Sequence, residues 1–369
     1  MTRLAPIPAS LPATVPFVGP ETLERRRGAP FAARLGANES AFGPSPLAAR
    51  AMREAVSGIW KYGDAPSHDL TEALAEHLGA APANIVVGEG IDGLLGNLVR
   101  LTVAPGDAVV TSDGAYPTFN YHVTGFGGVL HKVPYRDDRE DPEALLDRAA
   151  QTGARLIYLA NPDNPMGSWH PGQVIESMLD RLPPGCLLVL DEAYLEFAPD
   201  EARPAIAADD PRVIRMRTFS KAYGLAGARI GYALGAPELI AAFDRVRNHF
   251  GVNRIAQAGA LAALADQGWL AHVVAEVAAA RDRIAEIGAA NGLTARPSAT
   301  NFVALDTGRD GAFARALVAA LEAEDVFIRM PGVAPLDRCI RISCATLTEL
   351  DVLAAALPRA LSRALSHVG

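Results

Sequence analysis

The sequence predicts an α/β fold with a large domain, built on a mainly parallel sheet flanked by helices, and a smaller α+β domain. Three observations support this prediction. The chain has 369 residues, more than the roughly 250 to 300 residues at which a single core stops growing. Short apolar runs alternate with helical patterns up to about residue 250, as expected for strands buried between helices. Alanine-rich helical sequence and a shorter set of strand patterns follow.

The composition is that of a globular protein and excludes several classes of function. Hydrophobic residues make up 50% of the chain, charged residues 21%, and the net charge is −8. This balance, with no basic run longer than Arg25–Arg27, argues against a nucleic-acid partner. The N-terminus lacks a continuous apolar stretch behind a basic start, so neither a signal peptide nor a membrane span is expected. Cys186, Cys339 and Cys344 have no paired or metal-ligand spacing, which indicates reduced core thiols of a cytoplasmic protein and no metal site.

The chain divides into three predicted segments. Residues 1–35 are expected to form an extended N-terminal arm. Within it, a short helix is predicted over Pro20–Gly28, because proline opens and glycine closes such helices. Residues 36–255 form the predicted large cofactor-binding domain, and residues 256–369 the small C-terminal domain.

Apolar runs place the strands in order along the chain. In the large domain the predicted strands are Asn84–Gly88, Ala108–Thr111, Leu156–Ala160, Cys186–Leu190, Val213–Met216 and Ala228–Ala233. In the small domain they are Asn301–Leu305, Val326–Arg329 and Cys339–Ser343, before a terminal helix from Thr346. Each strand of the large domain ends near a polar or glycine-rich element, and ligands of open α/β sheets bind at that edge.

The segment Arg217–Gly231 carries the most specific chemistry. Lys221 is a candidate for covalent attachment of an aldehyde cofactor, because a lysine amine forms a Schiff base when a nearby cation or desolvation keeps part of its population neutral. Thr218 and Ser220 offer hydroxyls, and Arg229 a guanidinium, of the kinds that hold a phosphate. Taken alone, the segment favours the alternative, a loop that ends in an ordinary surface lysine.

Two further strand ends carry polar side chains. Asp191 follows the apolar run 186–190, so its carboxylate needs a partner at the end of a buried strand. A pyridinium nitrogen is one such partner, and a helix N-cap or a magnesium ion is the alternative. Tyr194, three residues later, could reach the same ring. Asn161–Gly167 is predicted to be a turn, where Asn164 either donates to a phenolic oxygen of a cofactor or serves the turn alone.

The remaining candidates bind anions or stack on rings. Gly88–Gly93 precedes a helical pattern, so its backbone N–H groups could cradle a phosphate, although this glycine spacing is weakly specific. Tyr116 either stacks on an aromatic ring or packs in the core. Arg341 lies within an alternating strand pattern, and Arg329 lies on the preceding candidate strand. Two such arginines indicate recognition of a substrate carboxylate or phosphate, or else structural salt bridges.

In this order, the motifs resemble those of the fold-type I, pyridoxal-phosphate-dependent aminotransferases, and most closely the histidinol-phosphate aminotransferase branch. The similarity runs from about Pro16 to the C-terminus. It includes, besides the motifs above, Gly36–Ser40, Gly43–Pro46, Trp60–Tyr62 and Arg341–Ser343. The resemblance implies a seven-stranded sheet, pyridoxal 5′-phosphate as cofactor, and a homodimer with active sites at its interface.

Position by position, the resemblance implies a complete cofactor site. Lys221 would hold the cofactor covalently and, once displaced by substrate, would shuttle the proton between substrate and cofactor carbons. Asp191 would pair with the pyridine nitrogen, Asn164 and Tyr194 would bond the 3′ oxygen of the ring, and Tyr116 would stack on its face. The implied phosphate ligands are Thr218, Ser220, Arg229, the backbone of Gly90, Ile91 and Asp92, and Tyr62 of the partner subunit.

On the substrate side the resemblance implies Asn38, Arg329, Arg341 and the arm residue Phe17. The branch usually has a tyrosine in place of Phe17. One hydrogen bond to a charged group is worth roughly 1.5 to 3 kcal/mol, so its loss would weaken a phosphate preference by about one or two decades.

The implied reaction moves an amino group between histidinol phosphate and the glutamate/2-oxoglutarate pair, a step of histidine biosynthesis. Three alternatives stay open at this point. The first is an aminotransferase for aromatic or other L-amino acids. The second is a pyridoxal-phosphate-dependent decarboxylase or lyase of the same fold, and the third is a ligand-binding module without catalysis.

Overall fold

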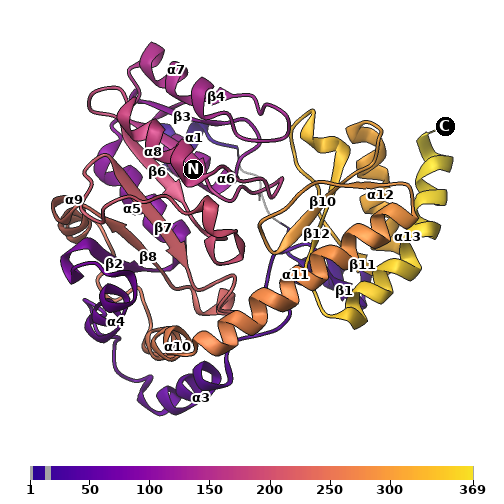
Figure 1. Cartoon of the computed structure of the whole chain (residues 1–369), viewed down its shortest axis with the longest axis horizontal. Coiled ribbons are helices and arrows are strands. Elements are labelled where there is room, and N and C mark those ends of the chain that lie inside the picture. The colour runs from indigo at the N-terminus through magenta and orange to yellow at the C-terminus, as the bar shows by residue number, and fades with distance from the viewer. Residues whose placement is uncertain (1–2, 13–17, 369) are drawn as a thin grey trace.

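The computed structural model describes residues 3–12 and 18–368 and places them in two lobes (Figure 1). The large lobe contains a seven-stranded sheet in the order β2-β8-β7-β6-β5-β3-β4. Its strands are β2 (Ile85–Gly88), β3 (Ala108–Ser112), β4 (Val129–Val133), β5 (Leu156–Ala160), β6 (Leu187–Asp191), β7 (Val213–Thr218) and β8 (Gly231–Gly235). Only β8 runs antiparallel to its neighbours, so the predicted, mainly parallel, seven-stranded sheet is confirmed.

Helices cover both faces of this sheet. The helices of the large lobe are α3 (Pro46–Ala55), α4 (His68–Leu78), α5 (Gly90–Thr102), α6 (Pro117–Gly125), α7 (Pro142–Thr152), α8 (Gly172–Asp180), α9 (Pro237–Ala242) and α10 (Arg254–Ala265). Along β5, Tyr158 packs toward α5 and α6 on one face, whereas Ile157 and Leu159 pack toward α7 and α8 on the other. A strand buried on both faces has a continuous apolar sequence, which is why these strands could be predicted.

β4 is a strand that no apolar run predicted. It lies at the edge of the sheet and, among the described residues, pairs with β3 alone. Val129 is 45% exposed, and the side chains of the strand include His131 and Lys132. An edge strand facing water needs no buried apolar run, so its sequence resembles that of a loop.

The small lobe combines a three-stranded antiparallel sheet with three helices. Its elements are β9 (Thr294–Ala295), β10 (Phe302–Asp306), β11 (Val326–Phe327), β12 (Cys339–Ser343), α11 (Gln267–Ala290), α12 (Gly311–Ala323) and α13 (Leu347–Val368). β10 lies between β9 and β12. A short parallel pair joins β11 to β1 (Ala33–Arg34), so residues shortly before the predicted large domain contact the small lobe. The division at residues 35/36 and 255/256 stays a prediction.

α11 connects the two lobes, running from beside α10 to the small lobe (Figure 1). Asp266 caps its first turn by accepting a hydrogen bond from the backbone N–H of Trp269 at 3.1 Å. The other oxygen of Asp266 accepts from Ser45 Oγ at 2.7 Å. Ser45 in turn caps α3, because its Oγ accepts from the N–H of Leu47 and Ala48. The starts of two helices are therefore joined through one side-chain contact.

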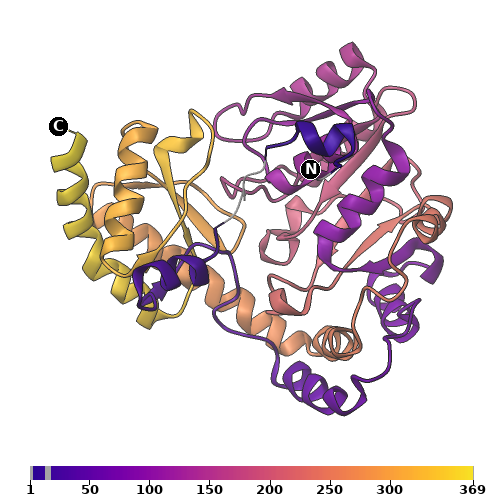
Figure 2. The same cartoon turned by 180° about the vertical axis from the view of Figure 1, so that it is seen from behind.

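The described part of the N-terminal segment contacts both lobes (Figure 2). α2 (Pro20–Arg27) ends at Gly28, which adopts a left-handed φ of 77°, as predicted. The prediction of an extended arm is wrong for α1 (Pro6–Ser10). Pro6 occupies the first helical position, where its fixed φ favours a helical turn and its missing N–H costs nothing. Among the described residues, no helix is both long and apolar enough to span a membrane.

Candidate active site

The polar segments that follow β5, β6 and β7 converge at one edge of the sheet. These strands are parallel neighbours, so their carboxyl ends lie together. The turn 161–167 follows β5, Asp191 ends β6, and residues 218–221 end and follow β7. The start of α5 and the small-lobe strand β12 complete the group, which lies where the two lobes meet.

Lys221 is held at this junction by the backbone of another segment. Its Nζ donates a hydrogen bond to the carbonyl oxygen of Asn38 at 3.0 Å and lies 5.7 Å from the centre of the Tyr194 ring. Burial, with smaller contributions from the positive charges of Arg341 and Arg229, lowers the pKa of Lys221 to about 8. About a tenth of a group with this pKa is neutral at pH 7, against less than about a thousandth for an ordinary lysine. The amine is therefore able to act as a nucleophile and as a base.

Asp191 is a buried carboxylate with two hydrogen-bond donors. Tyr158 donates its hydroxyl to Oδ2 at 2.6 Å, and the N–H of Ala193 donates to Oδ1 at 3.0 Å. Burial raises the pKa of Asp191 to about 6, although both donors act to lower it. The predicted alternative of a helix N-cap is not observed, because Tyr194, not Asp191, occupies the N-cap position of the following 3-10 helix. Among the described residues, no group of three or more His, Cys, Asp or Glu is arranged to hold a metal ion.

The hydroxyl of Tyr194 is the centre of a hydrogen-bond cluster. Asn38 donates to it from Nδ2 at 3.2 Å, and Asn164 donates from Nδ2 at 3.4 Å. Arg341 donates to the amide oxygen of Asn164. Burial raises the pKa of Tyr194, so the phenol stays protonated at neutral pH. The cluster joins the end of β6, the turn after β5 and the small lobe.

The two predicted arginines lie on adjacent backbone segments of the small lobe. Arg341 and Arg329 pair through their backbones, with the N–H of Arg341 donating to the carbonyl of Arg329 at 2.7 Å. The Nε of Arg341 is buried and has no hydrogen-bond partner, and its guanidinium lies 5.1 Å from the Phe302 ring centre. Arg329 donates to the carbonyl of Val18 at 2.7 Å. A buried guanidinium N–H without a partner is a suitable donor for an anionic ligand.

A glycine and an arginine form an anion cradle at the start of α5. Gly90 has a left-handed φ of 79°, and a Cβ built there would lie 2.7 Å from Nη2 of Arg229. Arg229 also has a left-handed φ, of 57°, and donates to the carbonyl of Ala226 at 3.0 Å. The hydroxyl of Thr218 donates to Ser220 Oγ at 2.9 Å. Free N–H groups at a helix start, a guanidinium and hydroxyls together suit a phosphate.

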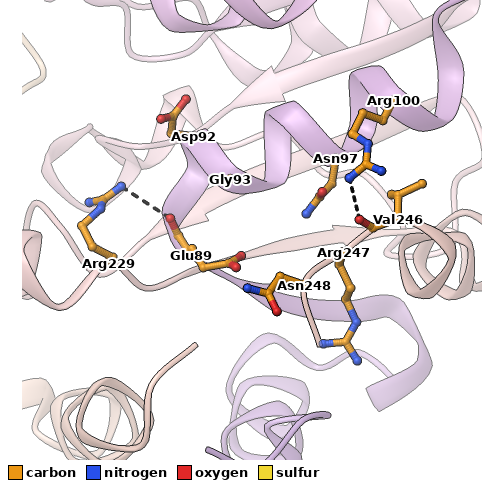
Figure 3. A pocket seen from close by; sticks show the side chains of 9 residues that line it. All are labelled: Glu89, Asp92, Gly93, Asn97, Arg100, Arg229, Val246, Arg247 and Asn248. Atoms are coloured by element: carbon orange, nitrogen blue, oxygen red, sulfur yellow. Dashed lines mark hydrogen bonds between the residues drawn. The ribbon is translucent and has the colours of Figure 1, made fainter. Parts of the chain in front are cut away.

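An open cavity of about 500 Å³ adjoins this cradle (Figure 3). In Figure 3, Arg229 lies beside the N-terminal turn of α5, and Arg247 and Asn248 lie on the opposite wall. Its lining residues are Glu89, Asp92, Gly93, Asn97, Arg100, Arg229, Val246, Arg247 and Asn248. The cavity is thus polar and opens beside the phosphate cradle rather than beside Lys221.

The remaining predicted residues occupy different positions. Tyr116 precedes α6, and burial raises its pKa, with smaller contributions from Asp92 and Asp191. Ile91 is buried, and Asp92 contacts Nε2 of His122 at 2.8 Å. Tyr62 is 75% exposed, and its ring centre lies 4.7 Å from that of Phe250, outside the Lys221 cluster. Phe17 lies outside the described residues.

Sequence reasoning missed three residues that hold the site. Asn301 donates from Nδ2 to the carbonyl of Asn38 at 3.1 Å. Ser343 donates its hydroxyl to Oδ1 of Asn38 at 3.0 Å and accepts from the N–H of Asn38 at 2.9 Å. Tyr158 is the third, through its bond to Asp191. A usable signal existed only for Tyr158, because a tyrosine in a fully buried strand needs a hydrogen-bond partner.

The fold and this group of residues define an aminotransferase. Residues 33–357 match the model of the family described as Aminotransferase class I and II, and the chain belongs to this family. The family and the fold predicted from the sequence are confirmed.

The similar proteins make the relationship more specific. A solved structure of histidinol-phosphate aminotransferase from Sinorhizobium meliloti, in complex with pyridoxal-5′-phosphate, is 57% identical, with a TM-score of 0.95 over 98% of each chain. A histidinol-phosphate aminotransferase from an Anaeromyxobacter species is 37% identical over 98% of this chain and 100% of that protein. An aromatic amino acid aminotransferase from Mycolicibacterium paratuberculosis is 35% identical over 95% of this chain and 99% of that protein.

Proposed function

We propose that this chain transfers an amino group between histidinol phosphate and the glutamate/2-oxoglutarate pair, with pyridoxal 5′-phosphate as cofactor, in histidine biosynthesis. One observation carries the proposal: the Lys221 amine, with a pKa lowered to about 8, lies beside the cluster around Tyr194 and near Asp191. The 57% identity to a histidinol-phosphate aminotransferase supports the substrate.

The residues present fit the cofactor. Asp191 is a buried carboxylate whose two donors are an uncharged phenol and a backbone N–H, which leaves its negative charge for a pyridinium nitrogen. A carbon added at Gly90 would lie 2.7 Å from Nη2 of Arg229, and this close approach of backbone and guanidinium suits a phosphate. The bound cofactor supplies an electron sink for the bond broken at the substrate carbon. Lys221 would bind its aldehyde group covalently.

Each residue of the chain then has a defined task. The Lys221 amine, once displaced by the substrate amine, would move the proton between the α-carbon of the substrate and the aldehyde carbon of the cofactor. Asp191 would keep the ring nitrogen protonated. Tyr194 and Asn164 would bond the 3′ oxygen of the ring, and Tyr116 would stack on its face. The phosphate would be held by Thr218, Ser220, Arg229 and the backbone of Gly90, Ile91 and Asp92.

The small lobe binds the anionic group of the substrate. Arg341 offers its unpartnered Nε, and Arg329 adds a second positive charge on the adjacent backbone segment. A phosphate and the carboxylates of glutamate both accept paired hydrogen bonds from a guanidinium, so one site serves both half-reactions. Asn38, whose amide bonds Tyr194 and Ser343, is the further residue that we assign to the substrate.

Chemical trapping tests the attachment of the cofactor. The chain has three lysines, Lys61, Lys132 and Lys221, and the first two are exposed. Borohydride reduction of the holoprotein followed by peptide mapping should place the cofactor on Lys221 alone. Lys221→Ala should lose visible absorbance and turnover, while Lys132→Ala should keep both. A yellow, active Lys221→Ala protein would contradict the proposal.

Single-turnover rates test the substrate. We expect histidinol phosphate and glutamate to convert the cofactor spectrum faster than phenylalanine or tyrosine. The second candidate, an aromatic amino acid aminotransferase, is favoured by the relative at 35% identity and by Phe17, and the reverse order of rates would support it. Phe17→Tyr should selectively speed the phosphorylated substrate. Stoichiometric carbon dioxide release without keto-acid formation would identify a decarboxylase instead.

The proposal includes a homodimer with active sites at its interface. Five exposed apolar side chains support it: Val56, Ile59, Trp60, Tyr62 and Phe250, each more than half exposed. We propose that a second copy covers them, which would bring Tyr62 of the partner subunit to the phosphate. Trp60→Glu should shift the sedimentation coefficient toward a monomer, whereas Leu347→Glu, an exposed position on α13, should not. An unchanged dimer in Trp60→Glu would exclude this interface.

We also place the enzyme in the cytoplasm. Cys186, Cys339 and Cys344 are free and buried, a state typical of a reducing compartment. Cell fractionation with an antibody against the chain would test this localisation.

A further inference from the structure

Tyr158 makes the shortest contact to Asp191, and its hydroxyl has a fixed position. The side chain is fully buried, and its ring stacks on Phe119 with centres 4.7 Å apart. Tyr158 on β5 pairs in register with Val189 on β6, two residues before Asp191. Because side chains two residues apart share a face of a sheet, the two strands themselves set the hydroxyl against the carboxylate. The bond therefore does not depend on a mobile loop.

The chemistry of this donor differs from that of an ion-pair partner. Burial raises the pKa of Tyr158 well above its ordinary value, and the charge of Asp191 raises it further, so the phenol donates and does not ionise. An arginine or lysine at position 158 would neutralise the charge of Asp191. That charge would then be less available to a second cation. A phenol stabilises the carboxylate and leaves its negative charge in place.

The surroundings of Asp191 otherwise oppose its charge. Burial raises its pKa to about 6, the donor bonds from Tyr158 and Ala193 lower it, and the nearby charge of Glu192 raises it. The titratable groups that act on Asp191, or on which it acts, are Tyr158, Glu192, Lys221, Tyr116, Tyr194 and Glu140. Lys221 contributes a weaker effect in the opposite direction to burial. Tyr158 is thus the side-chain donor on which the ionised form relies.

We propose that Tyr158 is a positioning residue of the reaction, because its hydroxyl keeps Asp191 ionised and aimed at the ring nitrogen of the cofactor. The inference rests on the proposed function, in which Asp191 keeps that nitrogen protonated. A hydrogen bond to a charged group is stronger than one to a neutral group. The difference is enough to shift the pKa of an acid by about one unit, which is a tenfold change in its ionisation constant.

Tyr158→Phe tests this role because it removes only the hydroxyl. In the apoprotein, the carboxyl pKa of Asp191, followed by carbon-13 NMR and assigned with Asp191→Asn, should rise by about one unit. The dissociation constant of pyridoxal 5′-phosphate should rise about tenfold, and kcat should fall while KM for the amino donor changes little. An unchanged Asp191 pKa with unchanged cofactor affinity would overturn the inference.

Tyr135→Phe is the matched control. Tyr135 donates its hydroxyl to Asp163 Oδ1 at 2.7 Å, so this substitution also removes one buried tyrosine–aspartate bond. It should destabilise the apoprotein much as Tyr158→Phe does, without moving the pKa of Asp191. If both variants shift Asp191 alike, the effect is a general response to lost packing and the inference fails.

A second variant covers the case in which Tyr158→Phe does not fold. 3,5-Difluorotyrosine placed at position 158 keeps the shape of the ring and makes the phenol a stronger donor, so the Asp191 pKa should fall. No shift would also overturn the inference. Failure of the proposed function is distinguishable, because wild-type protein would then bind no pyridoxal 5′-phosphate or would keep its affinity in Asp191→Asn.

Discussion

The buried amine of Lys221 makes the stability of the apoprotein depend on pH. Its pKa is lowered from 10.5 to about 8, chiefly by burial. Between these two values the unfolded chain binds more protons than the folded chain, so the free energy of unfolding rises with pH across this window. Below it, the buried cation costs about 1 to 3 kcal/mol.

Removal of this cation should therefore stabilise the apoprotein. Lys221→Met should raise the free energy of unfolding by about 1 to 3 kcal/mol at pH 7, with a gain that shrinks toward pH 10.5. Urea unfolding at the two pH values measures the difference, with the exposed Lys132→Met as control. An equal gain at both pH values would show that packing, not charge, is responsible.

Asn38 connects the two lobes through both its backbone and its side chain. Its φ is 55°, in the left-handed region, and its amide bonds Tyr194 and Ser343. Asn38→Gly should lose these bonds and about 2 kcal/mol of unfolding free energy. Asn38→Ala should lose about 1 kcal/mol more, because alanine adopts this φ at a cost. Equal free energies of unfolding for Asn38→Gly and Asn38→Ala in denaturant titrations would mean that the local backbone has relaxed.

At the scale of residues, the sequence allowed the groups with chemical reactivity to be predicted, but not the groups that hold them. Lys221 and Asp191 stand at the ends of recognisable strands. Asn301 and Ser343 lie in ordinary strand sequence and act on Asn38, more than 260 positions away in the chain. Contacts between such distant residues depend on how the two lobes pack, which no local pattern encodes.

At the scale of elements, the start of α5 offers a clean test of the phosphate cradle. Gly90→Ala would introduce both a strained φ and a carbon 2.7 Å from Arg229 Nη2. Gly106→Ala shares the strain, with φ of 91°, but its Cβ would meet no atom within 4 Å. Both variants should lose about 1 kcal/mol of stability. Only Gly90→Ala should weaken cofactor binding, by about tenfold or more, as measured by fluorescence titration.

Equal cofactor affinity in the two glycine variants would place the phosphate elsewhere. The glycine turn was a weakly specific motif in the sequence, and its function could be inferred only together with Arg229.

Elements buried on both faces, such as β5 and β6, were predicted to within about two residues. β4 and α1 were not, because an exposed edge strand and a proline-initiated turn leave no apolar period to detect.

At the scale of the whole molecule, Asp138 joins the lobes by ion pairs. It lies in the large lobe between β4 and α7 and bonds Arg338, at 2.7 Å, and Arg296, both of the small lobe. Burial opposes its ionisation, but the two arginines outweigh burial and lower its pKa. This stabilisation is therefore complete above pH 3.8, the ordinary value, and is lost as the pH falls through the lowered pKa.

Asp138→Asn should lower the free energy of unfolding by about 2 kcal/mol at pH 7. The neighbouring Asp137→Asn is the matched control, because both positions have a left-handed φ, of 53° and 62°, that asparagine tolerates. The two variants should converge when unfolding is repeated below the lowered pKa of Asp138, where that carboxyl has lost its charge. A persistent gap there would assign the effect to shape rather than charge.

The contact between Ser45 and Asp266 has a mechanical consequence. α11 has 24 residues, so it is about 36 Å long. Its first turn is fixed at Asp266 by the shared cap. A tilt of the helix by about 5° at this end displaces its far end by about 3 Å. Loss of the contact between Ser45 and Asp266 would thus displace the small lobe far more than it displaces the first turn of α11.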